Sequence, residues 1–128
     1  MMYNKLVEDC FFFPKHVGTL NLFEPRTVFF STRQFSKEVV ISLYMQCDSN
    51  KIVNAITFKS NGNPYVIASF EWLCRQTIGK KLEQWCFNCE ELIKLFDIPF
   101  NQAPVILHVQ DVYKEVLMLM NEKIEGES

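Results

Sequence analysis

Apolar and polar residues alternate most regularly between Val39 and Cys47. A period of two places alternate side chains on opposite faces of a strand, so this segment is expected to be a half-buried strand. Residues 48–51 have turn chemistry, and residues 52–59 return as a second strand, which predicts an antiparallel hairpin. A shorter apolar run, residues 27–30, predicts an edge strand. The apolar side of the first strand carries Val39, Ile41, Leu43, Met45 and Cys47.

Beyond residue 62 the apolar residues change to helical spacing. Asn63 is a good N-cap, Pro64 is tolerated at the first helical position, and Gly79 is typical of the residue just past a helix end. These signals predict a helix of about four turns with a wide apolar face packed against a sheet. That face consists of Ile67, Phe70, Cys74 and Ile78, flanked by Val66 and Leu73.

Three further segments have helical periodicity. Residues 3–12 predict a short helix that Pro14 ends, and residues 82–95 predict one or two short helices closed by residues 97–99. Residues 100–104 are expected to form a loop, and residues 110–123 the last helix, with Asp111 near its start. We therefore expect an α+β fold, a small antiparallel sheet of about three strands with helices on one face. The last helix is expected to bury Val109, Val112, Tyr113, Val116, Leu117 and Met120.

Composition narrows the class of protein. With 128 residues and 48% hydrophobic content, the chain is expected to form one domain over residues 1–128. A net charge of -2 and a pI near 5.7 give no basic field for a nucleic-acid partner. No apolar run is long enough to span a bilayer, so we expect a cytoplasmic protein without a membrane partner. Five cysteines at irregular spacing favour reduced thiols over a disulfide framework.

The candidate chemistry is sparse. Cys86 and Cys89 form a C-x-x-C pair, but a zinc site would need two further donors. Cys10 and His16 are the nearest nucleophile and base in the sequence, yet no orienting group or oxyanion motif accompanies them, so we expect no enzyme. His16 itself is expected to face solvent. Part of the cluster at residues 11–13 is expected to be exposed as a contact surface.

The segment around the central helix resembles a known family. The IscU/NifU iron-sulfur cluster scaffolds have the pattern G-C-G-x-A-I-A-S, followed after a fixed interval by G-K. Residues 14–18 also resemble the family's P-x-x-V-G. The resemblance covers nearly the whole chain and implies the SufE/IscU-like architecture, the same as the periodicity predicts. The matching residues are Gly62, Ile67, Ala68, Ser69, Gly79 and Lys80.

The same resemblance implies a cluster site built from three cysteines, an aspartate and a histidine. The family's C-G-D falls at Phe35 and Lys37, its second cysteine at Asn63, and its L-P-P-V-K-L-H-C ends at His108 and Val109. Only the histidine is retained. Phenylalanine and valine have no donor atom, and one imidazole cannot hold a cluster, so the site is interpreted as vestigial and without a cofactor.

Two hypotheses follow. The first is a protein-interaction or regulatory module with the scaffold fold, expected to act within iron-sulfur assembly. Its partner would be a cysteine desulfurase or another assembly protein, bound near Tyr3, Phe12, Pro104 and Val105. The second is a chain that still binds an iron-sulfur cluster or zinc, through Cys86, Cys89 and His108 or through ligands shared across a dimer. The resemblance leaves monomer and homodimer both open.

Overall fold

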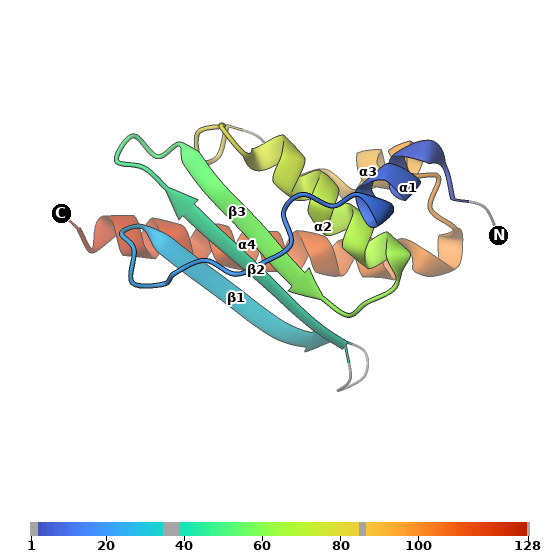
Figure 1. Cartoon of the computed structure of the whole chain (residues 1–128), viewed down its shortest axis with the longest axis horizontal. Helices are drawn as coiled ribbons and strands as arrows, with labels where there is room; N and C mark the ends of the chain where they lie inside the picture. Colours follow the sequence, from blue (N-terminus) through green and yellow to red (C-terminus); the bar gives the residue numbers. More distant parts are fainter. Residues whose placement is uncertain (1–2, 35–38, 85–86, 128) are drawn as a thin grey trace.

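A three-stranded antiparallel sheet with helices on one face forms the frame of the protein in a computed structural model, which describes residues 3–34, 39–84 and 87–127 (Figure 1). This confirms the predicted α+β fold. In chain order the elements are α1 (Lys5–Phe12), β1 (Thr27–Gln34), β2 (Val39–Cys47), β3 (Val53–Ser60), α2 (Pro64–Thr77), α3 (Cys89–Leu95), the 3-10 turn η1 (Phe100–Gln102) and α4 (Ala103–Glu125).

The sheet has the order β1-β2-β3, with both pairs antiparallel. The predicted hairpin of β2 and β3 is confirmed, and β1 continues four residues beyond its predicted end at residue 30. Asp48 closes the hairpin turn, because its Oδ1 accepts the N–H groups of Asn50 at 2.8 Å and Ile52 at 3.0 Å. Facing the helices, β2 buries Ile41, Leu43, Met45 and Cys47, as its alternation predicts.

Helix α2 begins and ends where its sequence signals place it. Asn63 is the N-cap, Pro64 the first helical residue, and Gly79 adopts a φ of +80° just past the end. Its apolar face differs from the prediction in one respect. Ile78 lies beyond the last turn and is exposed, and Ile67 is only partly buried. Towards the core the helix buries Val66, Ala68, Ser69, Phe70, Leu73, Cys74 and Thr77.

Helix α4 starts seven residues before the predicted position. Residues 100–104 are not a loop, because η1 leads directly into a helix that begins at Ala103. Pro104 lies in its first turn, where the missing N–H would have no helical partner, so the proline is compatible with the helix. Asp111 therefore lies more than two turns inside the helix. The buried face is Ile106, Val109, Val112, Tyr113, Val116 and Met120, and Leu117 is only partly buried.

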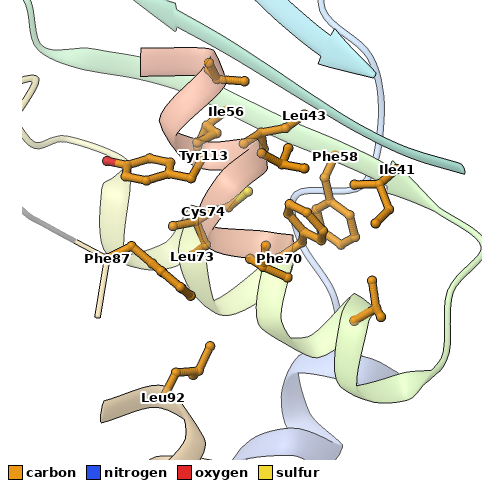
Figure 2. Close-up of a cluster of buried hydrophobic side chains, with 14 of the residues drawn as sticks. Ile41, Leu43, Ile56, Phe58, Phe70, Leu73, Cys74, Phe87, Leu92 and Tyr113 are labelled. Atoms are coloured by element: carbon orange, nitrogen blue, oxygen red, sulfur yellow. The ribbon is translucent and has the colours of Figure 1, made fainter. Parts of the chain in front are cut away.

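The core lies between the sheet and the helices α2 and α4 (Figure 2). At its centre the rings of Phe58 from β3 and Phe70 from α2 stack, with centroids 5.8 Å apart and planes at 21°. Phe87 extends this packing, since its ring contacts Trp72 of α2 and Tyr113 of α4 at 6.4 and 6.5 Å. Aromatic packing thus joins the sheet to both long helices.

The remaining segments pack around this frame, and one of them pairs with the β3 edge of the sheet. Of the described residues in the predicted stretch 82–95, only Cys89–Leu95 is an α-helix. The chain after α1 pairs with the outer edge of β3, where the Phe58 N–H donates to the carbonyl of His16 and the Gly18 N–H to the carbonyl of Phe58. Among the helices that the structure describes, none combines the length and apolar character needed to cross a membrane.

Candidate functional site

Several positions of the implied cluster site lie near one end of the molecule. The end of β1, the connection from β3 to α2, and the start of α4 come together at this end (Figure 1). Two other positions of the implied site, Phe35 and Lys37, lie outside the described residues. Asn63, His108 and Val109 are all described, and each has a different environment.

Asn63 uses both ends of its side-chain amide. Its Oδ1 accepts the backbone N–H groups of Tyr65 at 3.0 Å and Val66 at 3.1 Å, which satisfies two donors at the start of α2. Its Nδ2 donates to Oε1 of Gln102 at 2.9 Å, in the turn that leads into α4. Asn63 therefore joins α2 to the start of α4, and the predicted N-cap is confirmed.

Val109 and His108 are neighbours on α4 but lie on different faces of it. Val109 is fully buried and belongs to the core. His108 is partly buried and lines a hollow of about 350 Å³ with Phe30, Thr32 and Asp111, between β1 and α4. Six residues separate His108 from Gln102, which is about 9 Å along a helix axis. In the structure Asn63 therefore contacts Gln102, whereas His108 lies near β1.

Most of the described cysteines are buried in the core. Cys10, Cys47 and Cys74 are buried, and burial raises the pKa of each thiol, that of Cys10 to about 11. Cys89 is partly buried as the first residue of α3, and Cys86 lies outside the described residues, so the geometry of the C-x-x-C pair is not described. Within the described ranges, no group of three or more histidine, cysteine, aspartate or glutamate residues is arranged to hold a metal ion.

A buried acid network is the feature that sequence reasoning missed. Glu71 of α2 is fully buried, and its Oε1 accepts the backbone N–H groups of Lys15 and His16, each at 2.9 Å. Its Oε2 lies 2.9 Å from Nδ1 of His16 and 2.7 Å from Nε of Arg75. Arg75 also pairs with Asp9 of α1. His16 was expected to face solvent, and this is wrong because its ring is bound to Glu71.

This network bears on the candidate catalytic pair. A thiol with a pKa near 11 is almost entirely protonated at neutral pH, so Cys10 is a poor nucleophile. The ring of His16 is held through Nδ1 by Glu71, and no described contact joins it to the Cys10 thiol. The network instead fixes the segment after α1 to α2. The available signal for it was an acid, Glu71, beside Phe70 on the helix and four residues before Arg75.

Comparison with known proteins places this architecture in a family. A family model described as the NifU-like N terminal domain matches residues 2–124. The chain belongs to the NifU-like N-terminal domain family. A search of curated proteins finds no match. Among solved structures, the N-terminal part of a nitrogen-fixing NifU-like protein from Brucella abortus has a TM-score of 0.66 at 15% identity. The match covers 98% of this chain and 95% of that one.

Among the described residues of this NifU-like chain, those that the resemblance assigns to the cluster site are Asn63, His108 and Val109, and none of them is a thiol. Cluster ligation needs several converging thiolates. The Asn63 amide is engaged at both ends, Val109 has no donor atom and faces the core, and His108 offers a single imidazole. Of the described candidates, only Cys89 is a thiol with some exposure, and it lies on α3.

The four residues expected to bind a partner differ in exposure. Phe12 is 60% exposed and Pro104 is exposed, whereas Val105 is partly buried and the ring of Tyr3 packs edge-on against Tyr65 at 5.0 Å. A residue absent from that prediction is more exposed than Phe12. Phe100, in η1, is 95% exposed, and Leu107, at the start of α4, is 49% exposed.

The thiols provide a direct check of this site description. In the native NifU-like protein, Cys89 should react with iodoacetamide well before Cys10, Cys47 and Cys74. For Cys10, a pKa two units above the ordinary 9.0 lowers the reactive thiolate about a hundredfold at neutral pH. Mass spectrometry of peptides after timed labelling measures each rate, and labelling in denaturant is the control. Equal native rates at Cys10 and Cys89 would contradict the burial described here.

Proposed function

We propose that this NifU-like chain has a vestigial cluster position and acts as an interaction or regulatory module within iron-sulfur assembly. The observation that carries the proposal is the double role of Asn63. The family resemblance places a ligand cysteine at this position. Here the side chain caps α2 through Oδ1 and holds the start of α4 through Nδ2, so it serves the fold instead of a cluster.

The two positions on α4 support the same proposal. Val109, at the family's third cysteine, fills part of the core with an aliphatic side chain. A thiolate at this fully buried place would have to be desolvated, which is unfavourable without a metal beside it. His108, at the retained histidine, contributes to the hollow beside β1. Val109 and His108 therefore supply no thiolate ligand for a cluster.

The surface at this end supports a role in protein contact. Phe100 projects from η1 almost completely exposed, and Pro104 and Leu107 follow it at the start of α4, with Leu107 49% exposed. Exposed apolar side chains gathered on one face are typical of interaction sites, and large aromatic residues contribute strongly to binding. By analogy with the family, the proposed partner is a cysteine desulfurase or another assembly protein.

Metal and sulfide analysis tests the vestigial site. We expect protein purified without oxygen, then offered iron and sulfide, to remain colourless and to hold no stoichiometric iron, zinc or acid-labile sulfide. A scaffold of this family with all three cysteines is the positive control. A stable coloured cluster or one bound zinc would overturn the proposal. If Cys86→Ser or Cys89→Ser then abolished that binding, the C-x-x-C pair would be the site of the alternative function.

Paired surface variants test the contact surface. Phe100→Ser should weaken the binding of a cysteine desulfurase about tenfold or more, as loss of an exposed aromatic anchor commonly does. Phe23→Ser is the matched control, because Phe23 is 99% exposed in the connection before β1, at the opposite end of the frame (Figure 1). Isothermal titration measures both affinities. Equal affinities for the two variants would exclude this surface, and no binding by the wild type would exclude this partner.

A further inference from the structure

The two edge strands of the sheet, β3 and β1, have different neighbours. The outer edge of β3 is paired with the segment that follows α1, through the hydrogen bonds between Phe58 and residues His16 and Gly18. β1 is the opposite edge, and no strand or bridge lies beyond it in the described part of the chain. A strand edge of this kind presents N–H and C=O groups that can pair with another strand.

The sequence of β1 carries few of the features that usually protect an edge. Its eight residues, TVFFSTRQ, contain β-branched and aromatic side chains and neither proline nor lysine. Its pairing with β2 runs without a bulge from Thr27 to Gln34, so the edge is long and regular. Leu22, in the connection before β1, lines a hollow with the first three residues of the strand. The second half of the edge is therefore suited to pairing.

The helix beneath the edge carries charges of both signs. α4 packs under β1 and β2, and a hollow runs between β1 and the helix near Phe30. Asp111, Lys114 and Glu115 of α4 line this hollow. Acidic and basic residues thus lie within one turn of each other, which makes this row of the helix complementary to an antiparallel copy of itself.

We propose that β1 pairs antiparallel with β1 of a second copy of this chain, giving a continuous six-stranded sheet with the two α4 helices side by side. The two-fold axis passes near Ser31, so that Phe30 of one copy lies opposite Thr32 of the other on the helix-covered face. Opposite residues of an antiparallel pair share a face, and this register keeps both sets of helices on the same side.

The spacing of the layers favours a second copy as the occupant. Because α4 lies under both β1 and β2, two copies joined at a strand spacing of about 4.8 Å would place their α4 axes about 10 Å apart. Helices pack at about 8–10 Å, so sheet pairing and helix packing can form together. Near the axis, the antiparallel helices would bring Asp111 of each copy toward Lys114 of the other.

Oligomeric state tests the proposal. The wild type should sediment as a dimer in a concentration series, and Ser31→Lys should weaken dimerisation about tenfold or more, because two lysines would face each other at the axis. Ser31 is exposed, but its Oγ lies 2.8 Å from that of Ser42. Ser42→Ala, which removes the same hydroxyl contact from the central strand, is the matched control and should remain a dimer.

A charge exchange on α4 provides a second, independent test. Asp111→Lys should weaken the dimer, and the double variant Asp111→Lys with Lys114→Asp should restore it, which a purely structural effect would not do. Circular dichroism confirms that each variant is folded. A monomeric wild type at every concentration would overturn the proposal and leave the edge to a strand from another protein. A dimer insensitive to both Ser31→Lys and Asp111→Lys would place the interface elsewhere.

Discussion

Replacing Glu71 with alanine should lower the free energy of unfolding by about 3 kcal/mol or more, because a buried network would lose its central acceptor. The variant leaves the N–H groups of Lys15 and His16 without their acceptor and Arg75 without one of its two carboxylate partners. Buried donors that lose a partner keep their desolvation penalty. Urea unfolding at neutral pH, followed by circular dichroism, measures the change.

Two variants show whether the loss at Glu71 comes from this network. Glu71→Gln keeps an oxygen that can accept the two backbone N–H groups but loses the charge beside Arg75, so its loss should be intermediate. Glu122→Ala removes an exposed acid of α4 and should change stability by no more than about 0.5 kcal/mol. If Glu71→Ala and Glu122→Ala were equally mild, the network would not hold the segment after α1 in place.

Phe70→Ala should be the other strongly destabilising change, with a loss of about 3–5 kcal/mol, as expected when a buried phenylalanine leaves a cavity. Phe70 is fully buried between α2 and the sheet, and its ring stacks on Phe58 (Figure 2). Phe23→Ala is the control, since that ring is 99% exposed and buries almost nothing. Thermal and urea unfolding of both variants measure the difference.

The energy of the contact between the two stacked rings can also be measured separately from the energy of burying each ring. Combining Phe58→Ala with Phe70→Ala in a double-mutant cycle should give a coupling energy of about 0.5–1.5 kcal/mol. Strictly additive losses would indicate that the two rings contribute only through the area each buries. A Phe70→Ala variant as stable as Phe23→Ala would contradict the described core.

Much of the frame follows from local sequence signals. Asn63, Pro64 and Gly79 mark the ends of α2 because capping depends on residues within one turn. The alternation in β2 predicts its buried face because a strand in a sheet covered on one side has a period of two. The predicted start of α4 was wrong because proline gives two opposite local signals. Pro104 favours a break in most contexts, yet it is also favoured in the first turn of a helix.

The acid network and the candidate site were harder to predict. Glu71 receives its partners from residues 55 and 56 positions earlier, and no local pattern reports a contact at that distance in sequence. The cap at Asn63 was predictable from its position before Pro64, but its bond to Gln102 depends on how α4 begins. The environments of Phe35, Lys37 and Cys86 stay predictions, since these residues lie outside the described ranges.

The hydrogen bonds of the Asn63 side chain also determine what a substitution at this position would cost. A substitution to cysteine, the residue that the family pattern has here, would remove the α2 cap, at a loss of about 1 kcal/mol, together with the tie to Gln102. That loss would come at once, whereas any gain from metal ligation would need further thiols at other positions. A single change to cysteine at this position would therefore weaken the fold before any metal could be bound.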